Sequence, residues 1–512
     1  TIPDEETCWR FIDNFFEYIN PQLPIIDKTN FYETYTDLRN PPSLLLLNSV
    51  LFVGAWHTNS ESENPEEQFE SVRIAQIFLK RARFLYEYSI ECEPIALIQS
   101  LLCFCFNNEN MSNIAKNDYY WIHTAVGVAY AYNLHQKPAS SLTPYKRKMY
   151  KRLYWILFFK DRITAFGYSR PSAINVTDCD QEMLTVSDLS NSGMTHLEQI
   201  YLINLVKFGK LLDKIGAIQH EITKLYTNKR PVLHLMKKCD LIMIKFLQNL
   251  PKELKFKFND KSTHSFLSLM SLSQYYTLLI VIHRANILRH SADVYPSWAI
   301  TFQAVQMIKL LSDCLVAKNL IKKVALLSHN TLTSPAIIML YHLLNEDEKI
   351  SKIANEFFLR ILGIWRATYR KFPVVYPMMC IFGYIYNSEE HLKEIVKSVA
   401  PKYNSAGNSP GNIAKADVSQ EPNKAPLKLP DLSFIVNPGF RIHNMVDPFN
   451  LNSDPNASKF EDLGVNFDKL FSESVFAKGE TLVPKLDLES ISRKSKLRPQ
   501  PQNQMSPNVE MS

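Results

Sequence analysis

The feature that most constrains this chain is the helical spacing of its apolar residues over roughly the first 400 positions. Apolar residues recur three and four apart, and the period-two alternation of strands is nearly absent. Only 13 of the 512 residues are glycine, whereas about 7% is usual, which disfavours Gly-rich nucleotide-binding folds and most all-β folds. The sequence therefore predicts an all-α fold, a large irregular multi-helix body with helices near 13–19, 43–54, 68–88, 93–106, 118–133, 144–164, 196–226, 231–250, 262–289, 295–317, 335–344 and 350–370.

The composition changes near residue 400. Residues 401–512 contain 12 of the 28 prolines, and their apolar residues occur only in short islands. Such a segment cannot bury enough surface to offset the entropy of ordering it. We therefore predict two parts, a helical regulatory body over 1–400, ending with a helix at 389–399 before Pro401, and a disordered tail over 401–512.

Residues 144–164 predict a helix that starts at the surface and enters the core. Met149, Tyr150, Leu153, Ile156 and Leu157 share one side, and the second half is apolar all round. At its buried end Asp161 and Arg162 need polar partners. The opposite side carries Arg147, Lys148, Lys151 and Arg152. Together with Lys146 they form a basic cluster that is either a solvated face, which we favour, or a nuclear-import or phosphate contact.

The sequence contains no pattern of catalytic or metal-ligating residues. Eight cysteines include no C-x-x-C pair, and no GxSxG, HExxH, GxGxxG or GxxxxGK[ST] motif occurs. His283 and His290 are seven apart and could share a helix face, but two histidines alone make a weak metal site. We therefore expect no enzyme activity, cofactor or metal in this chain.

Two further patterns bear on partners. A net charge of +6 is too small to argue for non-specific nucleic-acid binding. The two longest apolar stretches, 44–55 and 372–386, are interrupted before they reach the roughly 18 apolar residues of a membrane-spanning helix. We therefore expect no membrane partner.

The tail carries two short segments with functional composition. Residues 460–476 interleave acidic residues with large apolar ones, which is typical of an amphipathic activation segment that recruits a coactivator, or of a short helix that docks on the body. The apolar positions are Phe460, Leu463, Phe467, Leu470, Phe471 and Phe476. A basic run is a candidate nuclear-import signal and consists of Arg493, Lys494, Lys496 and Arg498.

Residues 118–187 carry the most specific pattern, DYYWIHTAVGVAYAYNLHQ followed by YKRKMYKRLYWILFFKDRITAFGYSRPSAINVTDCDQEMLTVS. This stretch resembles the middle homology region of fungal binuclear zinc-cluster transcription factors, and about residues 1–340 share the likeness. Within that family it is most similar to the cutinase transcription factor branch. Ser169 stands where the family has glycine. The main matching positions are Trp121, Gly127, Arg152, Trp155, Asp161, Arg162, Arg170 and Pro171.

The resemblance implies a structural role for these positions. Gly127 would permit close helix approach, Trp155 would fill a helix crossing, and Asp161 with Arg162 would hydrogen-bond loop carbonyls around Arg170 and Pro171. The chain begins at Thr1 and lacks the family's cysteine-rich DNA reader. We therefore expect a zinc cluster that binds DNA upstream of Thr1, in a longer protein; the alternative is that this member of the family has lost the cluster.

The resemblance also implies a function. We expect the regulatory and activation part of a nuclear transcriptional activator, which controls lipid- or carbon-source-utilisation genes, with a coactivator as partner and a homodimer as one candidate assembly. Two alternatives stay open, a helical chromatin-assembly scaffold without activator role and a small-metabolite sensor.

Overall fold

The computed structural model describes residues 3–37, 39–58, 65–107, 116–227, 232–257, 260, 263–288, 297–320, 323–324, 328–344, 348–368, 375–388 and 390–393. Over these residues the fold is helical and contains no strand, which confirms the predicted all-α class. The α-helices are α1 (Glu5–Asn14), α2 (Lys28–Thr36), α3 (Leu44–Trp56), α4 (Pro65–Glu87), α5 (Pro94–Phe104), α6 (Asp118–Ala131), α7 (Pro144–Tyr168), α8 (His196–Thr227), α9 (Leu233–Gln248), α10 (Phe266–Leu288), α11 (Ser297–Ala317), α12 (Ser328–His342), α13 (Glu348–Thr368) and α14 (Val375–Asn387). A π-helical turn, η1 (Phe15–Ile19), continues α1, and short 3₁₀ turns include η5 (Lys252–Leu254).

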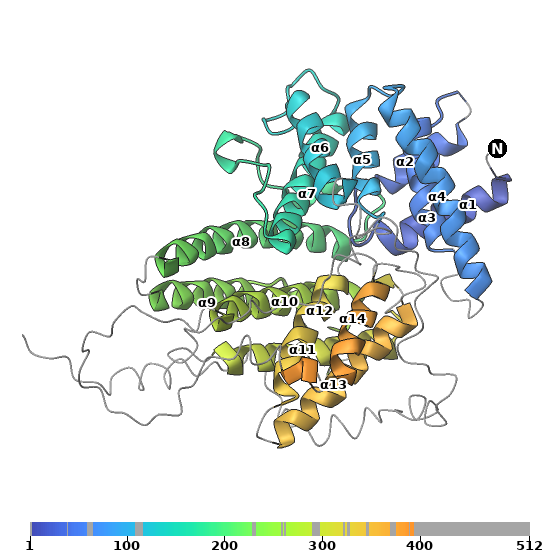
Figure 1. The fold of residues 1–512 in the computed structure, drawn as a ribbon. Helices are drawn as coiled ribbons and strands as arrows, with labels where there is room; N and C mark the ends of the chain where they lie inside the picture. The colour runs from blue at the N-terminus through green and yellow to red at the C-terminus, as the bar shows by residue number, and fades with distance from the viewer. Residues whose placement is uncertain are drawn as a thin grey trace, which may run out of the picture.

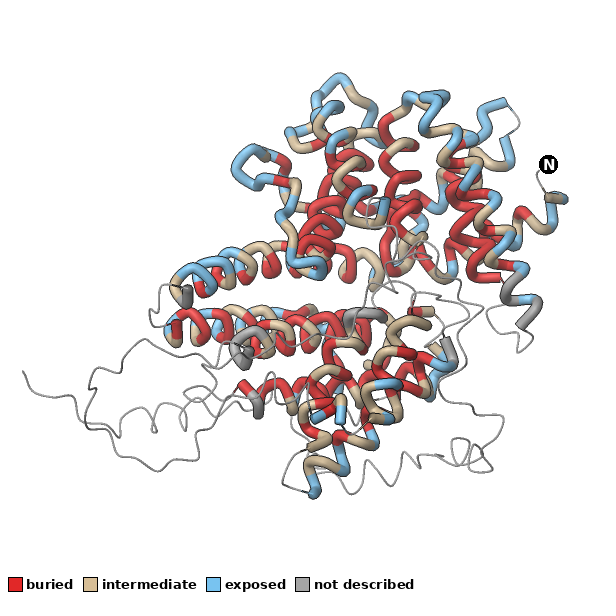
Figure 2. Tube along the Cα trace, viewed as in Figure 1, coloured by how far each residue is buried: buried red, intermediate tan, exposed pale blue. Residues whose placement is uncertain are grey.

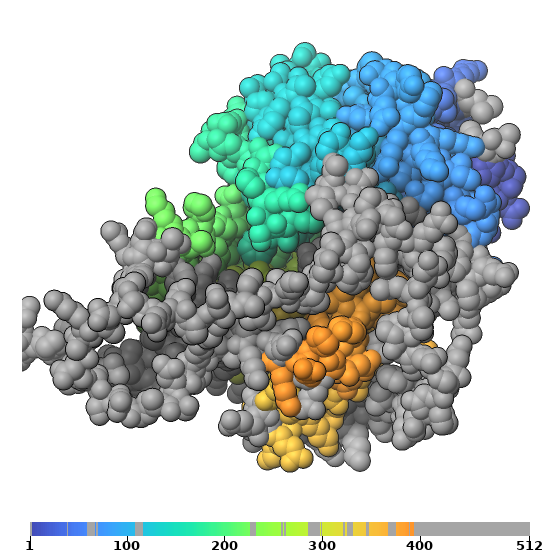
Figure 3. Space-filling model, in the orientation of Figure 1, coloured from blue at the N-terminus to red at the C-terminus, as the bar shows by residue number. Residues whose placement is uncertain are grey.

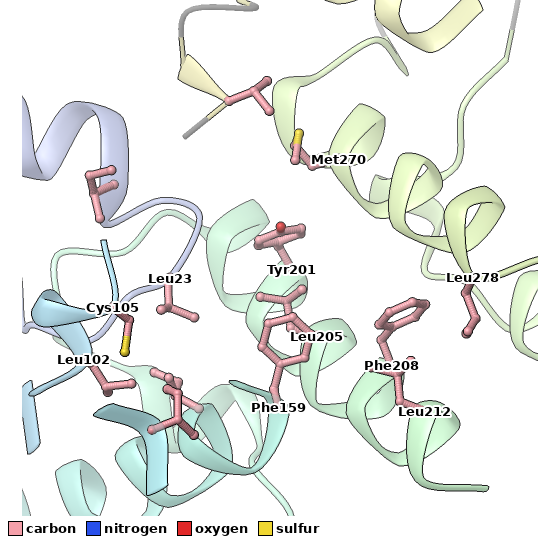
Figure 4. Packing of buried hydrophobic residues seen from close by; sticks show 14 of the residues in the cluster. Leu23, Leu102, Cys105, Phe159, Tyr201, Leu205, Phe208, Leu212, Met270 and Leu278 are labelled. Atoms are coloured by element: carbon pink, nitrogen blue, oxygen red, sulfur yellow. The ribbon is translucent and has the colours of Figure 1, made fainter. Parts of the chain in front are cut away.

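The long helix α8 joins two groups of helices. In Figure 1, α1 to α7 lie on one side of α8 and α9 to α14 on the other. Side chains of α8 pack in both directions: Tyr201, Leu205, Phe208 and Leu212 lie between Phe159 of α7 and the α10 residues Met270 and Leu278 (Figure 4). One continuous apolar core therefore runs through both groups.

Capping side chains explain where several helices begin. Asp4, Asp27, Ser43, Glu93, Asn117 and Thr143 each accept a hydrogen bond from a first-turn backbone N–H. Pro94 and Pro144 follow two of these caps, where the missing N–H costs nothing. The structure also adds helices that periodicity missed, α2 and α14, and starts α12 seven residues before Pro335, which lies inside that helix.

Burial follows the predicted course of α7. From Met149 to Asp161 every side chain is buried, and α3 is buried almost all round (Figure 2). Two windows in the described helices, Phe266–Arg284 and Ile300–Ala317, are long and apolar enough to cross a membrane, which the sequence reading missed. Because 83% and 61% of these windows are buried in the body, they also have the character of core helices.

Helices α1 and α3 approach each other closely at Gly54. A Cβ at this position would lie 1.8 Å from the carbonyl oxygen of Phe11, so only glycine lets α3 cross α1 this closely. The expectation that Gly127 serves this purpose is wrong, because Gly127 is exposed and a Cβ there would meet nothing within 4 Å. Glycine in a helix is thus informative only when the neighbouring helix is known.

Several predicted features lie outside the described residues. They are the tail 401–512, which includes the apolar positions Phe460, Leu463, Phe467, Leu470, Phe471 and Phe476 and the basic run Arg493, Lys494, Lys496 and Arg498, together with His290 and most of the helix expected at 389–399.

Candidate functional site: the loop clamp on helix α7

Helix α7 presents its motif residues to the loop that follows it. The helix ends at Tyr168, and Ser169 adopts a left-handed conformation with φ 52°. The N–H of Arg170 then donates to the carbonyl of Ala165 (2.9 Å) and turns the chain back along the helix. Glycine is the residue that adopts this conformation at least cost, which gives a physical reason for a glycine at this place in the family.

Asp161 and Arg162 hold the returning loop. The Asp161 carboxylate accepts from the N–H groups of Ala173 (2.8 Å) and Ile174 (3.0 Å). Arg162 donates from Nη1 to Asp161 (2.6 Å) and from Nη2 to the Ile174 carbonyl (2.7 Å). The expected bond to a loop carbonyl is therefore present for Arg162 only, because the Asp161 carboxylate accepts and so binds N–H groups, two to three residues beyond Pro171. We call this arrangement the loop clamp.

The loop clamp also reaches helix α8. Arg162 Nε donates to Asp213 Oδ1 (2.6 Å), and the guanidinium lies 4.7 Å from the centre of the Phe158 ring. Asp213 was not identified from the sequence, because it lies 51 residues away and belongs to no motif. The side chain of Arg162 is nearly buried, so its three hydrogen-bonded partners offset the desolvation of its charge.

Trp155 fixes a later part of the same loop. Its indole Nε1 donates to the carbonyl of Glu182 (2.7 Å), and Lys210 of α8 lies 4.9 Å from the ring centre. Gln181 donates from Nε2 to the carbonyls of Leu134 and Gln136 after α6. The buried tryptophan therefore anchors the loop as well as filling space between helices.

Arg170 and Pro171 lie at the outer edge of the loop clamp. The Arg170 guanidinium is 5.1 Å from the ring centre of Tyr119 and 5.3 Å from that of Tyr168. The Tyr119 hydroxyl donates to the Pro171 carbonyl (2.8 Å). Trp121, two residues after Tyr119 in α6, is buried against Phe104 and Tyr86. These motif residues join α6 and the loop into one unit.

The predicted solvated face of α7 is wrong at two positions. Arg152 is 1% exposed, and its Nη2 lies 3.8 Å from Asp27 Oδ2 at the start of α2. Lys151 is 9% exposed and pairs with Asp188 (2.8 Å). Burial lowers the pKa of Arg152. Helical phase alone could not reveal this, because α2 and the 186–189 turn cover that side of α7.

His283 has a carboxylate partner that its sequence neighbours did not indicate. Its Nε2 lies 2.9 Å from Asp240 of α9, and its Nδ1 lies 3.1 Å from Ser297 Oγ. All three side chains are buried, so the arrangement joins α9, α10 and α11 inside the core. No group of three or more metal-ligating side chains occurs among the described residues.

The comparisons with known proteins agree with the geometry of this region. The fungal specific transcription factor domain family matches residues 12–250, which include α6, α7 and the whole loop clamp. Residues 12–250 are therefore similar to this family. The resemblance seen in residues 118–187 is thereby confirmed.

Individual relatives of the chain are also fungal transcription regulators by name. The chain is 30% identical over 331 residues to cutinase transcription factor 1 alpha of Fusarium vanettenii. This alignment covers 62% of this chain and 36% of the relative. The chain is 28% identical over 290 residues to the acetamidase regulatory protein of Aspergillus fumigatus, which covers 56% of this chain and 36% of the relative. The chain thus spans about a third of the length of each of these two relatives.

Proposed function

We propose that this chain is the regulatory and activation part of a nuclear zinc-cluster transcriptional activator that controls lipid- or carbon-source-utilisation genes. The observation that carries the proposal is the loop clamp, which lies inside the matched family domain. Its buried charged side chains, Asp161 and Arg162, hydrogen-bond the loop backbone and Asp213. Groups engaged in this way stabilise a body and leave no reactive side chain free for chemistry. The relatives' printed names, a cutinase transcription factor and an acetamidase regulator, support the class of target genes.

The zinc of the proposed activator does not fit the described part of this chain. Zinc clusters need several closely spaced cysteine thiolates. Cys8, Cys103, Cys105, Cys239, Cys314 and Cys380 are buried, and no metal-ligating group of three side chains exists among the described residues. Burial raises the pKa of Cys314 to about 11, which opposes formation of the thiolate. We therefore assign DNA recognition to a cluster outside these residues.

Within the proposal, residues 460–476 recruit the coactivator. Phe460, Leu463, Phe467, Leu470 and Phe471 are spaced three, four, three and one apart, so an induced helix would place them along one stripe. Asp462, Asp468 and Glu473 would keep that stripe hydrated and speed the encounter with a basic partner surface.

A reporter assay tests the activator role. The tail 401–512 is fused to an unrelated DNA-binding domain, and reporter output is measured for the unchanged tail, for Phe467→Ala with Phe471→Ala, and for Asp468→Asn. We expect the unchanged tail to activate, the double change to abolish activation and Asp468→Asn to weaken it. A silent unchanged tail contradicts the proposal and favours a chromatin-assembly scaffold. Lower thermal stability of the whole chain in the double variant would mean that the segment docks on the body.

A further inference from the structure

The positive charge of this chain is concentrated in one helical hairpin. Residues 207–257 contain twelve Lys and Arg and only four Asp and Glu, a surplus that exceeds the net charge of +6 of the whole chain. The segment comprises α8 from Lys207 onward, α9 and the turn η5 that follows. We call it the basic hairpin. The net charge of the whole chain conceals this local surplus of positive charge, so a net charge of +6 does not exclude nucleic-acid binding by the hairpin.

The two helices of the basic hairpin are neighbours in space. The rings of Phe208 in α8 and Phe246 in α9 lie 5.7 Å apart, and Gln219 Nε2 lies 3.8 Å from Cys239 Sγ. Their lysines are therefore distributed along two neighbouring helices, which run side by side in Figure 1. The green atoms of this part of α8 reach the surface at the left of Figure 3. The exposed lysines are Lys207, Lys214, Lys224, Lys238, Lys245, Lys252, Lys255 and Lys257.

These charges are not neutralised within the body. Asp213 is bound to Arg162 of the loop clamp, and Asp240 is buried against His283. Only Glu221 and Glu253 remain as exposed acids among the described residues of the hairpin. Within the described part of the chain, none of the lysines from Lys207 to Lys257 forms an ion pair. The like charge of Lys214 adds to burial in lowering the pKa of Lys210.

A polyanion fits this surface better than a protein does. Protein interfaces need a cluster of buried aromatic or apolar anchors, whereas the outer side of α9 offers one, Leu241 at 59% exposed, between Lys238 and Lys245. A helix of 16 residues is about 24 Å long. Duplex DNA carries one charge per roughly 1.7 Å of its axis, so such a helix can face several phosphates at once.

We propose that the basic hairpin binds the phosphate backbone of duplex DNA without reading its sequence. The inference goes beyond the proposed function, because it requires neither a zinc cluster nor activation by the tail. Lysines of this kind position a protein on the duplex, while specificity is supplied elsewhere. The contact would hold the regulatory body against DNA beside the target site.

Binding of the full 512-residue chain to a fluorescent 30-base-pair duplex tests the proposal. Anisotropy is measured between about 50 and 200 mM salt, with two duplexes of unrelated sequence. The test variant combines Lys238→Gln, Lys245→Gln and Lys255→Gln. The control variant combines Lys80→Gln, Lys137→Gln and Lys352→Gln, which removes the same charge from exposed positions elsewhere. Both retain the basic run of the tail.

We expect micromolar binding that is equal for the two sequences and that falls steeply with salt. The test variant should lose at least tenfold in affinity at 100 mM salt, and its log–log salt slope should decrease by about two to three, because about 0.9 is lost per phosphate contact. The control variant should keep both quantities. Equal affinity and slope in the two variants would overturn the proposal. So would unchanged DNA binding by the test variant together with loss of binding to a peptide of residues 460–476, since the surface would then be a protein-docking site. Equal melting temperatures would establish that both variants are folded.

Discussion

Asp161 and Arg162 are consecutive residues of α7, and together they satisfy both backbone hydrogen-bonding groups of Ile174. Asp161 accepts from its N–H at 3.0 Å, and Arg162 donates to its carbonyl at 2.7 Å. A charged pair at the buried end of a helix thus replaces the hydrogen bonds that a sheet or a helix would otherwise give the loop. The motif that marks the family is therefore a device for holding a loop.

Replacement of Arg162 should be strongly destabilising. We expect Arg162→Ala to lower the free energy of unfolding by about 2–5 kcal/mol, because Asp161 and the Ile174 carbonyl would remain buried without this partner. Arg147→Ala is the matched control, since Arg147 lies on the same helix and is only half-buried. Denaturant unfolding of both variants provides the measurement. An unaltered unfolding midpoint for Arg162→Ala, with altered reporter output, would assign the pair to signalling instead.

A pair of glycine substitutions should have opposite effects. Gly54→Ala would place a Cβ 1.8 Å from the Phe11 carbonyl oxygen, which forces α3 away from α1 and should cost about 3 kcal/mol or more. Gly127→Ala meets nothing within 4 Å on an exposed helix face and should stabilise by about 0.5–1 kcal/mol through helix propensity. Thermal melts distinguish the two, and destabilisation by Gly127→Ala would show that the close contact is not confined to Gly54.

The comparison of sequence and structure separates local from tertiary information. The amphipathic and then fully apolar pattern of 144–164 predicted the burial of α7, because periodicity records which side of a helix meets the core. The same pattern placed Arg152 and Lys151 in solvent, since Asp27 and Asp188 come from distant segments that periodicity does not contain. The motif predicted that Asp161 and Arg162 bind the loop, but Asp213 lies outside every motif. Gly127 was chosen for its place in the motif, whereas the approach that requires glycine depends on the path of α1 past α3.

His342 should make the body sensitive to mild acid. The side chain is buried beside Phe302 at the end of α12, and burial lowers its pKa from 6.5 to about 4. Below pH 6.5 the unfolded chain binds a proton that the folded chain does not, so stability is complete above this pH and is lost as the pH falls towards 4. Between pH 7 and 4.5 we expect a loss of about 2–3 kcal/mol from this group. His342→Gln should flatten the pH dependence of the melting temperature, whereas His220→Gln, an exposed control, should leave it unchanged.

Removal of both charges of the Arg152–Asp27 pair should be better tolerated than removal of one. The guanidinium is buried, its Nε and Nη1 have no hydrogen-bond partner, and its distance to Asp27 is 3.8 Å. A pair with this geometry recovers little of its desolvation cost. Arg152→Ala alone should lower the free energy of unfolding by about 3–5 kcal/mol, because it leaves a cavity and an unpaired carboxylate. Arg152→Met with Asp27→Asn keeps the side-chain volume, and asparagine can still accept from the Asn30 N–H that Asp27 binds at the start of α2. The free energy of unfolding of this double variant should therefore lie within about 1 kcal/mol of that of the unchanged chain.

The single variants Arg152→Met and Asp27→Asn complete a double-mutant cycle, which is measured by urea unfolding. A double variant as unstable as Arg152→Ala would mean that the charge of Arg152 itself holds α7 against α2.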